Sequence, residues 1–174
     1  MLSVIIPTEG IEQTAVATLA ALVPGATAGV VREVLLVDRA GTGVIERVAD
    51  VAGCRFLPFQ GSHAAALAAG ARQARSPWLM FLHAGAVLDS GWIEETTQFI
   101  HGVSNSGRPR AGVFRYAPSP YADTGWRDGL KLIARDHYDR LGGHAPDARR
   151  AEARLLRRLG RSSRTLLRSR IMVA

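Results

Sequence analysis

The stretch Glu33-Val34-Leu35-Leu36-Val37-Asp38 decides the fold class. A short apolar run that ends in a polar residue is typical of a strand buried on both faces of a sheet. A similar run, Ser3-Val4-Ile5-Ile6-Pro7, precedes it, and a helical pattern from Glu12 to Val23 lies between the two. Because a strand, a helix and a strand in this order usually form a parallel pair, the sequence predicts a parallel sheet.

The same alternation continues to about residue 82. We expect a helix at 44–51, a strand at 54–59, a helix that begins after Ser62 and ends near Ala74, and a strand at 78–82. Ser62 is suited to cap its helix, since a serine hydroxyl accepts a hydrogen bond from the first turn. The predicted fold class is therefore α/β, with a mostly parallel sheet and helices on both faces, in a single domain of 174 residues.

Four segments follow the carboxyl ends of the predicted strands. They are Pro7-Thr8-Glu9, Asp38-Arg39, the loop around Gly61, and His83-Ala84-Gly85. Ligands of open α/β sheets bind beyond the carboxyl ends of the strands. We therefore expect these segments, which are far apart in the sequence, to meet and form one binding site.

The pattern changes after Asp89. We expect a helix at 92–100, a polar loop at 104–110, a strand at 111–116, a loop at 118–125, and helices at 130–141 and 146–159. The charge changes as well, because residues 1–100 carry a net charge of −3 and residues 101–174 carry +10. All but one of the basic residues are Arg, and nine Arg lie between 149 and 170.

Three interpretations of this Arg-rich segment remain open: a solvated face, a surface for a diphosphate or an anionic membrane, and a nucleic-acid surface. We expect no nucleic acid, because basic surfaces that bind it usually carry interleaved aromatic residues, and residues 149–170 contain none. The sequence shows no basic leader with a long apolar run after it, and no apolar run of membrane-spanning length. We expect a cytoplasmic protein, with peripheral attachment to a membrane left open.

The order of these pieces resembles a family 2 glycosyltransferase with the GT-A fold. The similarity covers about residues 2–161. In that family the second strand ends in an Asp that contacts the nucleotide base, as Asp38 ends the run 33–38 here. The other similar segments are the opening strand at 3–8, the nucleotide-covering segment at 61–70, the strand before the Asp-x-Asp metal motif at 78–86, the segment before the acceptor site at 135–143, and the Glu-Asp helix at 152–161. The resemblance implies a nucleotide-sugar half at about 1–90 and an acceptor half at about 91–174.

The metal motif of this family is altered in the chain. His83 and Gly85 stand where the resemblance places carboxylates that hold a divalent cation against the diphosphate. Mg²⁺ and Mn²⁺ prefer oxygen ligands, whereas imidazole suits zinc or copper better. The resemblance therefore implies a divalent cation, Mn²⁺ or Mg²⁺, only if the altered motif still binds one, and His83 is then the candidate ligand.

The Glu-Asp helix is altered as well. Glu152 is present, but Ala153 takes the place of the Asp that acts as the base in the family. Glu152 is therefore the candidate catalytic residue, and the alternative is a surface carboxylate that pairs with Arg149 or Arg150. Asp38 likewise has an alternative reading, as the cap of the turn that follows it.

Two functions are consistent with these residues. The first is sugar transfer from a nucleotide-sugar donor to an unknown acceptor, with a lipid-linked acceptor or an anionic membrane surface as a further partner. The second is a non-catalytic relative that serves as a nucleotide-binding, sugar-binding or protein-interaction module. The candidate nucleotide-binding residues are the same in both: Pro7, Thr8, Glu9, Asp38, Arg39, Gly61, His83 and Gly85.

Overall fold

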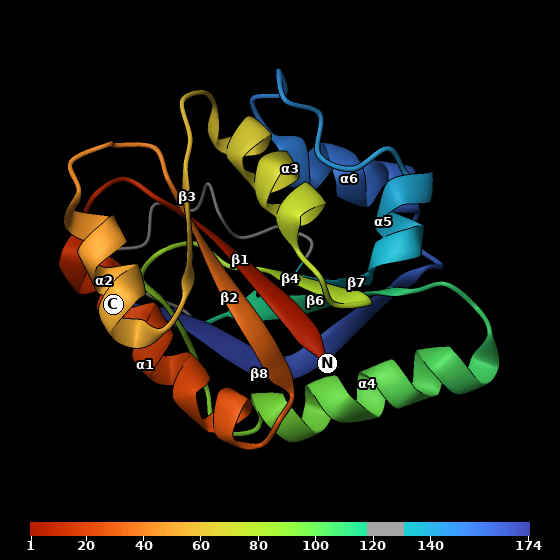
Figure 1. Ribbon diagram of the computed structural model, residues 1–174. Helices are drawn as coiled ribbons and strands as arrows, with labels where there is room; N and C mark the ends of the chain where they lie inside the picture. The colour runs from red at the N-terminus through yellow and green to blue at the C-terminus, as the bar shows by residue number, and fades with distance from the viewer. Residues whose placement is uncertain (118–130) are drawn as a thin grey trace.

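The computed structural model describes residues 1–117 and 131–174, which form one eight-stranded sheet between two layers of helices (Figure 1). The strand order is β3-β2-β1-β4-β7-β6-β8-β5. The strands are β1 (Leu2–Thr8), β2 (Val31–Asp38), β3 (Arg55–Pro58), β4 (Trp78–Phe81), β5 (Ala86–Leu88), β6 (Ala111–Tyr116), β7 (Leu132–Ala134) and β8 (Arg164–Val173). The helices are α1 (Glu12–Thr27), α2 (Val44–Ala52), α3 (His63–Gln73), α4 (Trp92–Ser106), α5 (Arg135–Arg140) and α6 (Ala151–Leu159).

The N-terminal half of the sheet confirms the prediction. β3, β2, β1 and β4 are parallel neighbours, and Val4 of β1 lies between Val34 of β2 and Met80 of β4. All seven residues of β1 are buried, which explains why its sequence is a continuous apolar run rather than an alternating one. Ser62 caps α3 as expected, because its hydroxyl accepts a hydrogen bond from the backbone N–H of Ala65 at 3.0 Å.

Helices cover both faces of the sheet, as predicted. α1, α2 and α4 lie on one face and α3, α5 and α6 on the other (Figure 1). Adjacent residues of β2 point to opposite faces of the sheet. Leu36 belongs to the same hydrophobic core cluster as Trp92 of α4, and Leu35 belongs to the same cluster as Leu155 of α6. Among the described residues, no helix has the length and apolar character needed to cross a bilayer.

The prediction of a helix at 130–141 is wrong in its first part. Leu132–Ala134 forms β7, and the helix α5 begins only at Arg135. Leu132 and Ile133 are fully buried because β7 pairs antiparallel with both β4 and β6. Sheet pairing overrides the local helical pattern here. The loop expected at 118–125 lies outside the described residues.

The sequence analysis missed two strands, β5 and β8. β8 lies between β6 and β5 and begins inside the Arg-rich segment. Its side chains alternate, with Leu167, Ser169 and Ile171 buried and Arg168 and Arg170 exposed. This period of two is the ordinary strand signal, and the count of arginines concealed it.

Three helix boundaries also differ from the prediction. α1 continues through Pro24 to Thr27, where Gly25 packs so closely against Trp92 that an added Cβ would lie 2.4 Å from the indole ring. α4 extends to Ser106 into the expected polar loop, and α6 begins at Ala151 rather than near Pro146. Packing against the rest of the protein sets these ends, which local patterns place poorly.

Gly70 marks the closest approach of α3 to the sheet. A Cβ added at Gly70 would lie 2.4 Å from Cγ2 of Ile5 and 3.1 Å from Cγ2 of Val37. We expect Gly70→Ala to lower the free energy of unfolding by about 1–3 kcal/mol, because the helix must move away from a packed strand. The control is Gly102→Ala in α4, where nothing lies within 4 Å of the added Cβ and stability should be unchanged or slightly raised. Urea denaturation measures both, and equal stabilities for the two variants would contradict this packing.

Candidate functional site

β1 and β2 end side by side, and a buried hydrogen bond joins their last residues. Thr8 Oγ1 donates to Asp38 Oδ1 at 3.1 Å, and the backbone N–H of Gly41 donates to Asp38 Oδ2 at 2.9 Å. Asp38 is only 1% exposed. Its carboxylate therefore holds the turn at 39–41 against the end of β1, as the capping reading of this residue expects, and its contact with a nucleotide base stays a prediction.

Arg39 connects three of the predicted segments. Its Nη1 forms an ion pair with Glu9, and its Nε donates to the carbonyl oxygen of Gly61 at 2.9 Å. Gly61 has a φ of +147°, and an added Cβ would lie 2.9 Å from the ring of Phe59, so this loop requires glycine. Pro7, which belongs to the same set, lies within β1 opposite Val37. The loops after β1, β2 and β3 therefore meet at one edge of the sheet, which we call the carboxyl edge.

His83 follows β4 at the carboxyl edge, and neighbouring groups hold its ring there. Its Nδ1 lies 3.0 Å from the carbonyl oxygen of Ala84, and its ring stacks on that of Tyr116 with centroids 5.6 Å apart. Burial lowers the pKa of His83, and the ammonium group of Lys131 lowers it further, against the opposing effects of the Ala84 hydrogen bond and Glu152. The ring is therefore neutral near pH 7 and is held by packing.

Gly85 cannot readily be replaced by a carboxylate residue. Its φ is +93°, and an added Cβ would lie 3.3 Å from the carbonyl oxygen of Ala174. Residues 83–85 thus offer one imidazole and no carboxylate. Across residues 1–117 and 131–174, no group of three or more His, Cys, Asp or Glu is arranged to hold a metal ion. These residues do not fit Mg²⁺ or Mn²⁺, which require several oxygen ligands.

Glu152, in the first turn of α6, pairs with Lys131 rather than with Arg149 or Arg150. Lys131 Nζ donates to Glu152 Oε1 at 3.2 Å and lies 5.6 Å from the centroid of the Tyr116 ring. Lys131 is 1% exposed, whereas the side chain of Glu152 is 16% exposed. Burial alone would lower the pKa of Lys131, but the charge of Glu152 and the phenol of Tyr116 outweigh it and raise the pKa above its usual value.

The sheet itself positions Lys131. The backbone N–H of Phe81 donates to the carbonyl oxygen of Lys131 at 2.9 Å. The backbone N–H of Lys131 donates to the carbonyl oxygen of Gly112 at 3.2 Å. The residue is thus held between β4 and β6, just before β7 begins. An ammonium group buried at such a place needs an anionic partner, and Glu152 provides it.

Two further histidines lie around this pair. Burial lowers the pKa of His63 and of His144 to about 4, although the charge of Glu152 acts in the opposite direction on both. The backbone N–H of His144 donates to the hydroxyl oxygen of Tyr138 at 3.0 Å. The same hydroxyl oxygen lies 2.9 Å from the ring nitrogen Nδ1 of His144. We call His63, His83, Lys131, His144 and Glu152 the polar cluster.

The sequence analysis missed three residues of this region: Lys131, Tyr116 and His144. Lys131 carried a signal, since it is the only Lys among 22 basic residues. Tyr116 ends a strand that was predicted, so knowledge of the direction of β6 would have placed it at the carboxyl edge. His144 carried no signal, because only the tertiary fold brings its ring against Phe81 of β4.

No protein-family model matches the chain, and no curated protein matches it in sequence. Solved structures do match. TarS 1–349 from S. aureus has a TM-score of 0.73 and 12% sequence identity, over 99% of this chain and 60% of that one. The mannosyltransferase PcManGT from Pyrobaculum calidifontis, in complex with GDP-Man and Mn²⁺, has a TM-score of 0.70 and 16% identity, over 99% of this chain and 56% of that one.

Glucosyl-3-phosphoglycerate synthase from Mycobacterium tuberculosis, in complex with Mn²⁺, UDP and glucosyl-3-phosphoglycerate, is a third match. Its TM-score is 0.70 at 15% identity, over 95% of this chain and 68% of that one. The chain thus spans about 60% of the length of the TarS fragment. At these identities the similarity shows the fold, which is that of GT-A glycosyltransferases.

The buried pair of Lys131 and Glu152 predicts a large effect on stability. We expect Lys131→Met or Glu152→Gln to lower the free energy of unfolding by about 3–5 kcal/mol, because each leaves a charge without its partner. The double variant should recover part of the loss. The control is Arg140→Ala, which breaks the exposed pair with Asp136 and should cost at most about 0.5 kcal/mol. Chemical denaturation checks this, and a small effect at Lys131 would contradict a buried pair.

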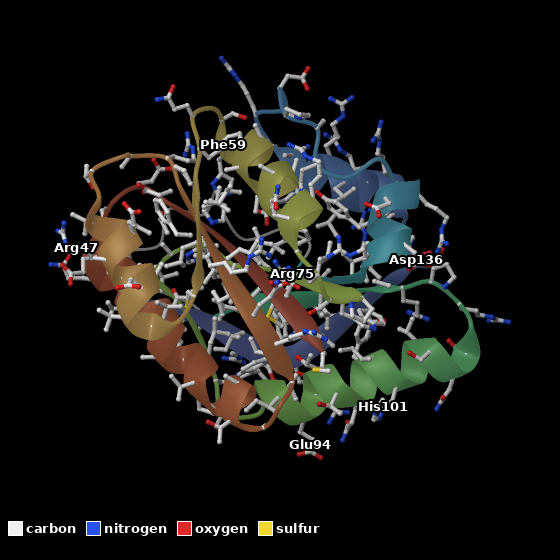
Figure 2. The ribbon with its side chains drawn as sticks, viewed as in Figure 1. Arg47, Phe59, Arg75, Glu94, His101 and Asp136 are labelled. Carbon is white, nitrogen blue, oxygen red and sulfur yellow. The ribbon has the colours of Figure 1, made fainter. Side chains whose placement is uncertain are left out.

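His63, which is half-buried, and His144, which is buried, predict a loss of stability in acid. Their folded-state pKa of about 4 lies below the ordinary histidine pKa of 6.5, so the unfolded chain binds more protons between these pH values. The free energy of unfolding should therefore fall as the pH drops from 6.5 to 4. His144→Asn should flatten this dependence, and His101→Gln, on the exposed side of α4 (Figure 2), should not. Urea denaturation at several pH values measures the slope, and identical slopes in the two variants would refute it.

Proposed function

We propose that the protein binds a nucleoside diphosphate, free or as a nucleotide sugar, at the carboxyl edge. The observation that carries the proposal is the convergence of separate segments at this edge of a GT-A sheet. The ends of β1, β2 and β4, the Gly61 loop and the first turn of α6 all contribute polar groups there. A solved TarS structure contains UDP-GlcNAc and that of PcManGT contains GDP-Man, which supports the proposal through the shared fold.

Side chains of the protein, rather than a metal ion, would meet the negative charge of the diphosphate. Arg39 is partly exposed and its guanidinium is already oriented by Glu9 and Gly61, which suits it to phosphate oxygens. Lys131 is the second cation, and because its side chain is only 1% exposed it would act on the diphosphate through its charge rather than by contact. Both charges lower the pKa of His63, so both act on the space around the start of α3. We therefore expect binding that does not require Mn²⁺, in contrast to the Mn²⁺-containing structures of PcManGT and the synthase.

Sugar transfer is the second candidate function, and one observation favours it. Glu152 is the carboxylate that acts on His63, His83 and His144 together, and its side chain is accessible enough to reach a ligand. Its pairing commits Oε1 to Lys131, and the neighbouring position, where the family has its base, is Ala153. We therefore place nucleotide binding first and transfer, including transfer to a lipid-linked acceptor, second.

A thermal-unfolding screen with UDP, GDP, CDP and dTDP, each with and without Mn²⁺, tests the binding proposal. One nucleotide at about 100 times its dissociation constant should stabilise the protein by about 2.7 kcal/mol, and chelation of metal should not remove the effect. Arg39→Gln should weaken that binding about tenfold, since a charged hydrogen bond is lost. Arg47→Gln on α2 (Figure 2) is the matched control and should bind as the unchanged protein does.

Stabilisation by none of the nucleotides would overturn the proposal, and stabilisation only with Mn²⁺ would overturn its metal-independent part. Incubation with the nucleotide sugars of whichever nucleotide binds addresses transfer, because chromatography detects sugar released from a bound nucleotide sugar. Transfer predicts a turnover that Glu152→Gln lowers by about 10² or more in a variant that still binds the nucleotide. If the unchanged protein shows no turnover, nucleotide binding remains as the only proposed function.

A further inference from the structure

A cavity of about 510 Å³ lies along α6, where that helix packs beside β6 and β8. Its walls combine two kinds of side chain. Three are cationic, Arg150, Arg157 and Arg164, and four are apolar, Val113, Ala153, Leu156 and Leu166. We call this cavity the Arg pocket. Its volume is within the range of cavities that bind small molecules.

Within residues 1–117 and 131–174, no counter-charge accompanies the arginines of the Arg pocket. In this part of the chain no carboxylate side chain lines the cavity, and none of the ion pairs involves its three arginines. Arg164 is held in place because its Nη2 donates to the carbonyl oxygen of Leu156, while its Nε is buried without a hydrogen-bond partner in the described part of the chain. Guanidinium groups that line one cavity without a counter-charge repel each other, and a bound anion would remove that repulsion.

The periodicity of α6 separates the Arg pocket from the polar cluster. Residues three and four apart lie on one face of a helix, so Arg150, Ala153 and Arg157 form one row along the cavity. Glu152 belongs to the next row, together with the buried Leu155 and Leu159, and points to Lys131 instead. Adjacent residues of one helix thus serve two different places, and the pocket does not depend on the nucleotide site.

We propose that the Arg pocket binds a phosphate monoester that carries an apolar substituent. A monoester presents three terminal oxygens and up to two negative charges, which match several guanidinium forks. The apolar walls would cover the substituent, since Leu166 is 52% exposed and gains from burial. A soluble phosphorylated metabolite and a lipid with a monoester headgroup share this chemistry.

Calorimetry with phenyl phosphate as the probe tests the pocket in the full chain. Phenyl phosphate should bind, phenol should not, and inorganic phosphate should bind more weakly because it leaves the apolar walls uncovered. Arg150→Gln and Arg157→Gln should each weaken phenyl phosphate about tenfold. Arg154→Gln is the matched control, because Arg154 is exposed on the same helix and does not line the cavity. Ala153→Asp should abolish binding by placing a negative charge in the cavity.

Two further measurements separate this proposal from nucleotide binding at the carboxyl edge and identify the source of the ligand. Binding of phenyl phosphate should be unchanged at saturating nucleoside diphosphate, and failure of every nucleotide to bind would leave this measurement intact. Vesicles of phosphatidylcholine that contain phosphatidic acid, but not those with phosphatidylserine, should bind if the source is a lipid, and neither should if it is soluble. The Arg pocket would be overturned as a site if neither phenyl phosphate nor the phosphatidic acid vesicles bound. An equal loss of phenyl phosphate affinity in Arg154→Gln and Arg157→Gln would overturn it as well.

Discussion

A buried ammonium group needs an anionic partner, and this requirement organises the carboxyl edge of the sheet. Lys131 is tied by its backbone to β4 and β6, and only 1% of the residue is exposed to solvent. Glu152 meets the charge from α6, which fixes where that helix begins over the sheet. Tyr116 lies against the ammonium group and against His83, so the pair also determines the packing at the end of β4.

The same arrangement changes how the edge can treat a charged ligand. In a metal-dependent site the carboxylates hold a cation, and the cation neutralises the phosphates. Here positions 83 and 85 supply an imidazole held by stacking and a glycine whose backbone no other residue readily adopts. The positive groups at this edge are the partly exposed Arg39 and the buried Lys131, both of which belong to the protein. Under the proposed function, this edge would bind a diphosphate without activating it as a leaving group, because each cation already has a carboxylate partner.

α6 connects this edge to the rest of the C-terminal half. One row of its residues is buried against the sheet, and the neighbouring row opens into the Arg pocket beside β8. The arginines of the C-terminal segment therefore divide between two environments. Arg168 and Arg170 alternate with buried residues along β8 and face solvent, whereas Arg150, Arg157 and Arg164 surround a cavity. A count of charges along the chain cannot separate these two groups.

The sequence alone determined the N-terminal half, because apolar runs such as 33–38 are buried on both faces and only a covered parallel sheet accommodates them. It also placed Thr8, Asp38, Arg39 and Gly61 at one edge, since parallel strands end together. Only the tertiary structure decided that Leu132 and Ile133 form a strand, that the Arg-rich segment supplies β8, and that Glu152 pairs with Lys131. These features depend on contacts between distant residues, whose energies outweigh local preference and which local patterns do not specify.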